Sequence, residues 1–190
     1  MRLFDEIPRL ADDRILLREL TAEDAPALSE IAGDPEIYRY LPTFLYEQKY
    51  PDAKTVIARM REECFEPKES IFLGVCLRTD PSRVVGLAEI YNYEPEKEKA
   101  SIGYRLNRAY WGQGIASAAV ALLRDYLTGR TDVRKITAHV MVENEASAKV
   151  LERNGFELKW TGLREDWGKG VPVTINKFRY KKEKANNETI

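Results

Sequence analysis

Two glycines separated by one residue, Gly112 and Gly114, constrain the fold more than any other feature of this chain. They lie in the stretch RAYWGQGIASAA, where aromatic and polar residues give way to small and apolar residues at helical spacing. The chain contains only 11 glycines in 190 residues, and a simple turn needs one at most. The pair therefore predicts a tight entry into a helix at a place where a ligand comes close to the backbone.

The charge balance and the apolar content of the chain limit the kinds of partner that it can bind. The chain has 30 basic and 31 acidic residues and is 44% hydrophobic, so it lacks the basic excess of a nucleic-acid-binding surface. No apolar stretch approaches the roughly 20 residues that span a bilayer, and the first residues, MRLFDEIPRL, lack the apolar run of a signal peptide. We expect a cytoplasmic protein that binds neither nucleic acid nor membrane.

The cysteines and the single histidine argue against a metal site. Cys64 and Cys76 are not spaced as a ligand pair, and His139 is the only histidine. A zinc site needs several such ligands in a recognisable spacing, so we expect no metal. In a cytosolic protein the two thiols are expected to be reduced and partly buried.

The order of the segments predicts a mixed α/β (α+β) fold with a mostly antiparallel sheet. Only one strand–helix–strand crossover, through the glycine pair, is present, whereas a doubly wound sheet alternates helices and strands throughout. Periodicity and end signals predict strands over 14–20, 70–78, 83–93, 99–107, 135–142, 158–167 and 171–180, and helices over 21–33, 52–65, 114–127 and 144–155. We expect a single domain over 1–180 and a polar, disordered tail over 181–190.

Comparison with known phosphate-binding motifs excludes some types of binding site for the glycine pair. A P-loop needs Lys and Ser or Thr after its last glycine, but Ile115 and Ala116 follow here. A dinucleotide fingerprint needs a third glycine where Ser117 stands, and an acid about 20 residues further on that is missing. A purely structural helix start and a phosphate cradle on the free amides of the first helical turn both remain open.

The stretch YWGQGIASAAV resembles the acyl-CoA signature Gln/Arg-x-x-Gly-x-Gly/Ala of the GNAT superfamily of N-acetyltransferases. Gly114 and Ala116 match this signature, and Trp111 stands where many members have Gln or Arg. The stretch NEASAKVLERNGFE is similar to a second motif, Asn-x-x-Ser followed by Gly-Phe, of the branch that acetylates the N-terminal alanine or serine of ribosomal proteins. SIGYRL and GLRED also resemble that branch, and the likeness runs from Arg14 to Tyr180.

The resemblance implies a GNAT fold and a donor site for acetyl-CoA. In this fold the strands SIGYRL and KITAHVMV splay apart, and the pantetheine arm lies in the gap while the phosphates rest on the amides of the glycine turn. The implied donor-binding residues are Leu106, Trp111, Gly112, Gln113, Gly114, Ile115, Ala116, Ser117, Asn144 and Ser147. The implied reaction is direct attack by a primary amine, of a protein N-terminus or a small molecule, within a ternary complex.

The sequence indicates the groups that transfer protons less clearly than it indicates the donor site. Leu151 occupies the position at which many members carry a tyrosine acid, so Ser147 is our candidate donor to the sulfur of CoA. Ser101 stands near the position of the usual glutamate base. Glu89, in an otherwise apolar strand, and Glu165, in GLRED, are the alternative carboxylates, and burial of Glu89 in the cleft would raise its pKa.

The remaining side chains of interest have a structural and a functional interpretation. His139 alternates with Thr137 and Met141 along its strand, and we expect a core or edge histidine rather than a base. The aromatic segment between the first two helices is expected to pack as a lid, and by resemblance its residues Tyr38, Tyr40 and Phe44 could line the acceptor pocket.

Three further hypotheses remain at this stage. A catalytically silent acyl-CoA-binding or sensing module would bind acetyl-CoA without releasing thiol, which the missing tyrosine and glutamate make a real alternative. A nicotinamide-dependent oxidoreductase would prefer NAD to CoA. An exposed strand at the C-terminal end could pair two subunits into a homodimer.

Overall fold

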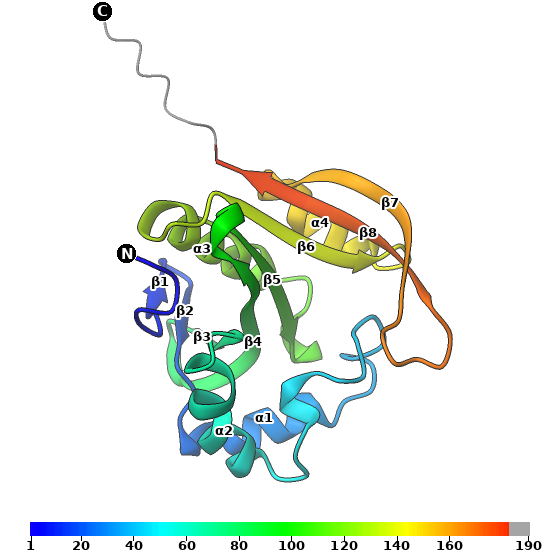
Figure 1. Ribbon diagram of the computed structural model, residues 1–190. Coiled ribbons are helices and arrows are strands. Elements are labelled where there is room, and N and C mark those ends of the chain that lie inside the picture. Colours follow the sequence, from blue (N-terminus) through cyan, green and yellow to red (C-terminus); the bar gives the residue numbers. More distant parts are fainter. Residues whose placement is uncertain (183–190) are drawn as a thin grey trace, which may run out of the picture.

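The computed structural model describes residues 1–182, which form one eight-stranded sheet in the order β1-β2-β3-β4-β5-β6-β8-β7 (Figure 1). All neighbouring strands are antiparallel except β5 and β6. The strands are β1 Leu10–Ala11, β2 Ile15–Arg18, β3 Ser70–Leu77, β4 Asp80–Glu94, β5 Lys99–Leu106, β6 Lys135–Met141, β7 Glu157–Glu165 and β8 Val173–Lys181. The predicted mixed, mostly antiparallel sheet with one crossover is therefore confirmed.

The helices cover the two faces of the sheet in pairs (Figure 1). They are α1 Ala25–Ala32, α2 Ala53–Met60, α3 Ile115–Arg130 and α4 Glu145–Arg153. Alternation along β4 shows the division, because Leu87 packs in the cluster beneath α1 and α2 whereas Ala88 and Ile90 pack in the cluster beneath α3. Glu89 therefore projects from the same face as Leu87.

The sheet opens between β5 and β6. These strands pair only from Lys99 to Ser101, and the last contact is a hydrogen bond of 2.8 Å between the buried hydroxyls of Ser101 and Thr137. Beyond this contact β6 pairs only with β8, and β5 pairs only with β4. Asn107 N donates to Val85 O, so by alternation the peptide groups of residues 104 and 106 point into the gap. Leu106 O accepts from the Trp111 indole, so the peptide group of residue 104 and the N–H of residue 106 are the groups that face the opening.

The structure differs from the sequence prediction mainly at element ends. The predicted helix 21–33 begins with a short 3-10 turn, Ala22–Asp24, because the buried Asp24 carboxylate accepts from Thr21 N and pairs with Arg18. β1 was not predicted, since two residues carry no periodic pattern. α3 extends to Arg130, beyond the predicted end at 127.

The C-terminal end carries two further predictions. Lys181, placed in the predicted tail, is the last residue of β8, and Lys182 N after it donates a backbone hydrogen bond to Arg134 O. The rest of the predicted tail, 183–190, lies outside the described residues. β7 is the outermost strand, and residues 157–164 are exposed. Pairing of two subunits through this strand stays a prediction that the mass of the protein in solution tests.

Candidate active site

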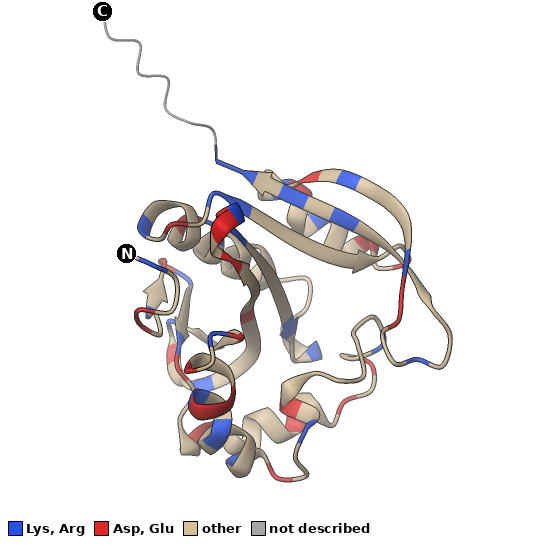
Figure 2. Ribbon diagram, in the orientation of Figure 1, with Lys and Arg blue, Asp and Glu red and all other residues tan. Residues whose placement is uncertain are grey.

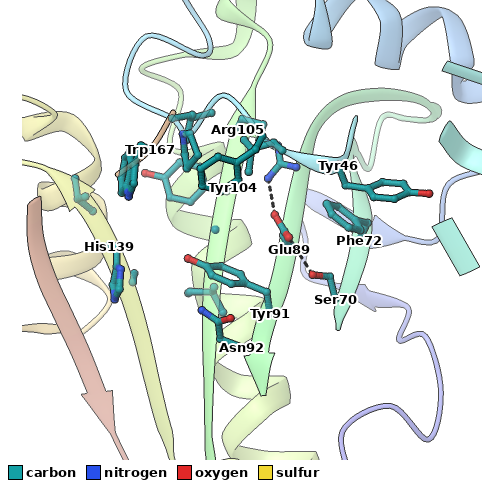
Figure 3. Close-up of a pocket in the computed structure, with 18 of the residues that line it drawn as sticks. Tyr46, Ser70, Phe72, Glu89, Tyr91, Asn92, Tyr104, Arg105, His139 and Trp167 are labelled. Carbon is teal, nitrogen blue, oxygen red and sulfur yellow. Dashed lines mark hydrogen bonds and ion pairs between the residues drawn. The ribbon is translucent and has the colours of Figure 1, made fainter. Parts of the chain in front are cut away.

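A cavity of about 1060 Å³ opens where β5 and β6 separate. Its walls come from strands β3 to β6, the segment 40–49, α4 and the end of β7. Figure 3 shows Glu89 and Arg105 on one side and His139 on the other, with Tyr91 and Tyr104 extending into the space between them. The cavity touches residues of both faces, Glu89 beside α1 and α2, and Ser147 on α4. It therefore passes through the split in the sheet.

The glycine turn leaves a row of backbone donors at the start of α3. Gly112 and Gly114 have φ values of 72° and 76°, so the backbone conformation itself favours glycine at both positions. The expectation that a turn needs only one of them was wrong. Ala118 N is the first amide to enter the helix ladder, through Gly114 O, and within residues 1–182 the amides of 112–117 donate to no backbone carbonyl. Their free N–H groups suit the pyrophosphate of a coenzyme.

Some of the other residues predicted at the donor site already form hydrogen bonds within the protein. Trp111 is half exposed, and its indole N–H donates to Leu106 O at 2.9 Å, so only the N–H of Leu106 is left for the pantetheine arm. Gln113 O accepts from Arg14. Ile115 is buried in the core, whereas the Ser117 hydroxyl accepts from Asn154 Nδ2 at 3.0 Å.

Ser147 meets a tyrosine that the sequence did not single out. Its hydroxyl lies 2.9 Å from the Tyr104 hydroxyl, and both groups line the cavity. Burial raises the pKa of Tyr104 to about 12, so it carries its proton at neutral pH. Asn144 begins α4 as its cap, with Oδ1 accepting from Ser147 N at 3.2 Å, and Leu151 is buried beneath them. Alternation along SIGYRL places Tyr104 and Arg105 on opposite faces of the strand, and this was the sequence signal that Tyr104 could face the donor side of the sheet.

Glu89 lies in the cavity wall as the sequence suggested, but it is not free. Its Oε2 accepts from Arg105 Nη1 at 2.9 Å and its Oε1 from the Ser70 hydroxyl at 3.2 Å. Arg105 Nη2 also reaches Glu47 Oε2 at 2.5 Å, and all three charged side chains are buried. Burial raises the pKa of Glu89 despite the opposing effect of Arg105. Its role as a base stays a prediction.

His139 lines the cavity at the point where β6 has lost its β5 neighbour, so it is an edge histidine with a hydrogen-bond partner, as expected. Its Nδ1 lies 3.2 Å from Glu165 Oε1, and Glu165 Oε2 accepts from the Trp167 indole N–H at 2.9 Å. Glu165 is thus at the site, as predicted, but it is held between two partners. Periodicity placed His139 on one face of its strand without showing that the neighbouring strand is absent there.

The segment predicted to line the acceptor pocket does so only in part. Tyr40 and Phe44 line the cavity. Tyr38 does not, because it is buried in the core beneath α1 and α2, where its hydroxyl donates to Glu47 Oε1 at 2.7 Å. Ser101 lies at the closed end of the split, bonded to Thr137, and takes no part in the wall of the cavity.

Charges of both signs are spread over the molecule, with an excess of lysine and arginine along β8 (Figure 2). Free amides at a helix start, a split sheet and a cavity that passes through it define a protein that holds an acyl-CoA thioester against a second substrate. Within residues 1–182, none of the helices combines the length and apolar character that crossing a membrane requires.

Comparison with known proteins gives the same class. The family profile "Acetyltransferase (GNAT) domain" matches residues 14–157. The "uncharacterized N-acetyltransferase p20" of Bacillus licheniformis is 31% identical over 171 residues, 90% of this chain and 93% of that protein. The ribosomal-protein-serine acetyltransferase of Escherichia coli (strain K12) is 33% identical over 76 residues, 40% of this chain and 42% of that protein. The structure of the acetyltransferase (GNAT family) from Bacillus anthracis covers 92% of this chain and 98% of its own, with a TM-score of 0.76 at 19% identity.

The chain therefore belongs to the GNAT family of acetyltransferases. It is an N-acetyltransferase that takes an acetyl group from acetyl-CoA and passes it to an amine, as the resemblance implied. The silent sensing module and the nicotinamide-dependent oxidoreductase are set aside by this result.

Replacing Gly112 by alanine tests the donor site. An alanine at φ 72° costs about 1–2 kcal/mol of folding free energy. Its Cβ would meet no protein atom within 4 Å, so the added methyl projects into open space at the glycine turn, where we expect the phosphates. We expect acetyl-CoA affinity to fall roughly tenfold or more, corresponding to about 1.4 kcal/mol, measured by calorimetric titration. Gly129→Ala is the control, because Gly129 lies within α3 with equally open space at its Cβ. If Gly112→Ala bound acetyl-CoA with unchanged affinity, the phosphates would not bind at the glycine turn.

Proposed function

We propose that the protein acetylates the α-amino group of a protein N-terminus, which enters the cavity from the side of α1 and α2. The observation that carries this proposal is the cavity that passes through the split between β5 and β6, with Tyr104 and Ser147 on one side of the sheet and the segment 40–49 on the other. The acetyl group would lie at the split and the amine would approach from the opposite face. Positioning of this kind contributes roughly 7–11 kcal/mol to such reactions.

The cavity wall carries charges of both signs. Glu89 is paired with Arg105 and Glu165 with His139, and Lys49 is paired with Glu63. Glu69 and Asp166 also line the cavity and can attract the cationic form of an amine. The E. coli relative named a ribosomal-protein-serine acetyltransferase adds support for an N-terminal substrate.

The residues predicted for the chemistry take the following roles in this proposal. Ser147 and Tyr104, joined by their hydroxyls, supply a hydrogen bond and a proton to the departing sulfur of CoA. An N–H group in the gap, such as that of residue 104, bonds the thioester oxygen as its negative charge develops. Glu89 and Glu165 flank the incoming amine from the two walls.

We further place the protein in the cytoplasm. Cys64 and Cys76 are buried and unpaired thiols, which agrees with a reducing compartment. Fractionation of cells with an antibody against the protein tests this placement.

The acceptor is tested by thiol release from acetyl-CoA with a panel of amines. The panel contains peptides that begin with Ser, Ala or Met, the same peptides with a blocked α-amino group, a polyamine, an aminoglycoside and free amino acids. We expect release with at least one free peptide and none with its blocked form. Release with the polyamine or aminoglycoside alone would contradict the proposal and assign a small-molecule acceptor.

A further inference from the structure

His139 and Glu165 form a pair of side chains brought together from two different strands. The imidazole Nδ1 lies 3.2 Å from Glu165 Oε1 and 3.4 Å from Oε2. The Trp167 indole N–H holds Oε2 at 2.9 Å. The carboxylate is therefore fixed in place by a neutral donor that cannot itself titrate.

The position of His139 on β6 directs its side chain to the acceptor side of the split. Thr137, two residues earlier, reaches the Ser101 hydroxyl on this face, and alternation places His139 on the same face. The β5–β6 pairing ends at Thr137, so His139 is the first side chain of that face to meet the gap. Its side chain is 21% exposed and lines the cavity (Figure 3).

The hydrogen bond to Glu165 determines which nitrogen is available. An ionised carboxylate can only accept, so the proton of a neutral imidazole lies on Nδ1 and the lone pair lies on Nε2. By contrast, both oxygens of Glu89 are engaged, one by Arg105 and one by Ser70. Of the three groups placed beside the amine, Glu89, Glu165 and His139, His139 is the one that can offer a lone pair without breaking an ion pair.

We propose that His139 is the catalytic residue that takes the proton from the attacking amine, and that Glu165 is a positioning residue acting through it. This inference rests on the proposed acetyl transfer to an amine. The amine nitrogen forms a bond to the acetyl carbon, the carbon–sulfur bond breaks, and the sulfur takes a proton from the Tyr104–Ser147 pair. The proton lost from nitrogen passes to Nε2, and exchange with water restores both groups.

The charges around His139 set the direction of its titration. Burial lowers the pKa of His139 below 6.5, as do Lys177, which pairs with it in register from β8, and Lys99 on β5, whereas Glu165 raises it. Tyr91 and Tyr104, which line the same cavity from β4 and β5, have raised pKa values and remain neutral. His139 is thus unprotonated near pH 7 and loses its capacity as a base as the pH falls through its pKa.

The tautomer can be measured without any acceptor. Since the chain has one histidine, a two-dimensional ¹⁵N–¹H spectrum contains one imidazole, and we expect its proton on Nδ1 and a pKa below 6.5. Lys177→Gln is expected to raise this pKa and Glu165→Gln to lower it. A proton on Nε2 in the protein bound to acetyl-CoA would overturn the proposal.

The rate measurement uses His139→Gln with the best acceptor of the panel. We expect kcat to fall roughly 10²–10⁴-fold, with the affinity for acetyl-CoA and the melting temperature unchanged, and with the acidic limb of the pH profile lost. Lys177→Gln should keep the plateau rate and move that limb to higher pH, which a merely structural effect would not do. An unchanged rate and limb in His139→Gln would overturn the role of His139. Absence of thiol release by the wild type with every amine would instead contradict the proposed acceptor, and the spectrum would still decide the tautomer.

Discussion

Arg105→Met is expected to lower the free energy of unfolding by about 3–5 kcal/mol, the largest effect of any single polar substitution considered. Arg105 is 3% exposed in its side chain and bonds two buried carboxylates, Glu47 at 2.5 Å and Glu89 at 2.9 Å. Its removal leaves both carboxylates in a low-dielectric site without a cation. Urea unfolding followed by circular dichroism measures the loss.

The consequence for function follows from where the two carboxylates lie. Glu47 belongs to the segment between α1 and α2, whereas Glu89 belongs to β4. Arg105 therefore fastens the acceptor side of the cavity to the central sheet. In any Arg105→Met protein that remains folded, we expect the KM of the acceptor to rise and the affinity for acetyl-CoA to persist.

A surface ion pair supplies the control for Arg105→Met. Arg108 bonds Asp34 at 2.6 Å, but its side chain is 55% exposed, so Arg108→Met is expected to change stability very little. Replacing the whole buried group, as Glu47→Gln, Arg105→Met and Glu89→Gln together, should recover part of the loss because no unpaired charge remains. If Arg105→Met were as stable as Arg108→Met, the buried ion group would not be what fastens this segment.

Tyr104→Phe and Ser147→Ala are each expected to lower kcat roughly 10²-fold, with little change in acetyl-CoA affinity. Their hydroxyls are joined at 2.9 Å in the cavity, and each substitution interrupts the same path for the proton that the sulfur needs. The double variant should therefore be about as slow as either single variant. Single-turnover measurements of thiol release compare the four proteins.

Tyr126→Phe is the matched control for the loss of a tyrosine hydroxyl. Tyr126 lies on the buried face of α3, and its hydroxyl has no hydrogen-bond partner within residues 1–182. Its removal should leave kcat and stability intact. Additive losses in the Tyr104–Ser147 cycle would mean that the two hydroxyls act independently, which contradicts a shared path to sulfur.

The donor half of the site could be predicted from sequence because its determinants are local. Gly112, Gly114 and the helix after them are contiguous, and so are Asn144 and Ser147 at the start of α4. Even so, the reason given for the glycines was incomplete, because the positive φ of both residues favours glycine independently of any contact with a ligand. A single sequence cannot separate a backbone requirement from a ligand requirement at the same residue.

The acceptor half could not be predicted because its pairs join distant segments. Arg105 and Glu47 are 58 positions apart, Tyr104 and Ser147 are 43 apart, and His139 and Glu165 are 26 apart. Alternation assigns each side chain to a face of its strand, but it does not show which residues of other strands or helices that side chain contacts. The place of His139 in the cavity wall could not be predicted for this reason, since its exposure depends on the end of the β5–β6 pairing at Thr137.

The structure of the protein bound to acetyl-CoA tests the central claim most directly, namely that the split between β5 and β6 is the active centre. We expect the phosphates on the amides of 112–117, the pantetheine arm along residues 102–106, and the thioester between the Tyr104–Ser147 hydroxyls and His139. Acetyl-CoA bound on another face, with the split closed by side chains, would contradict the account.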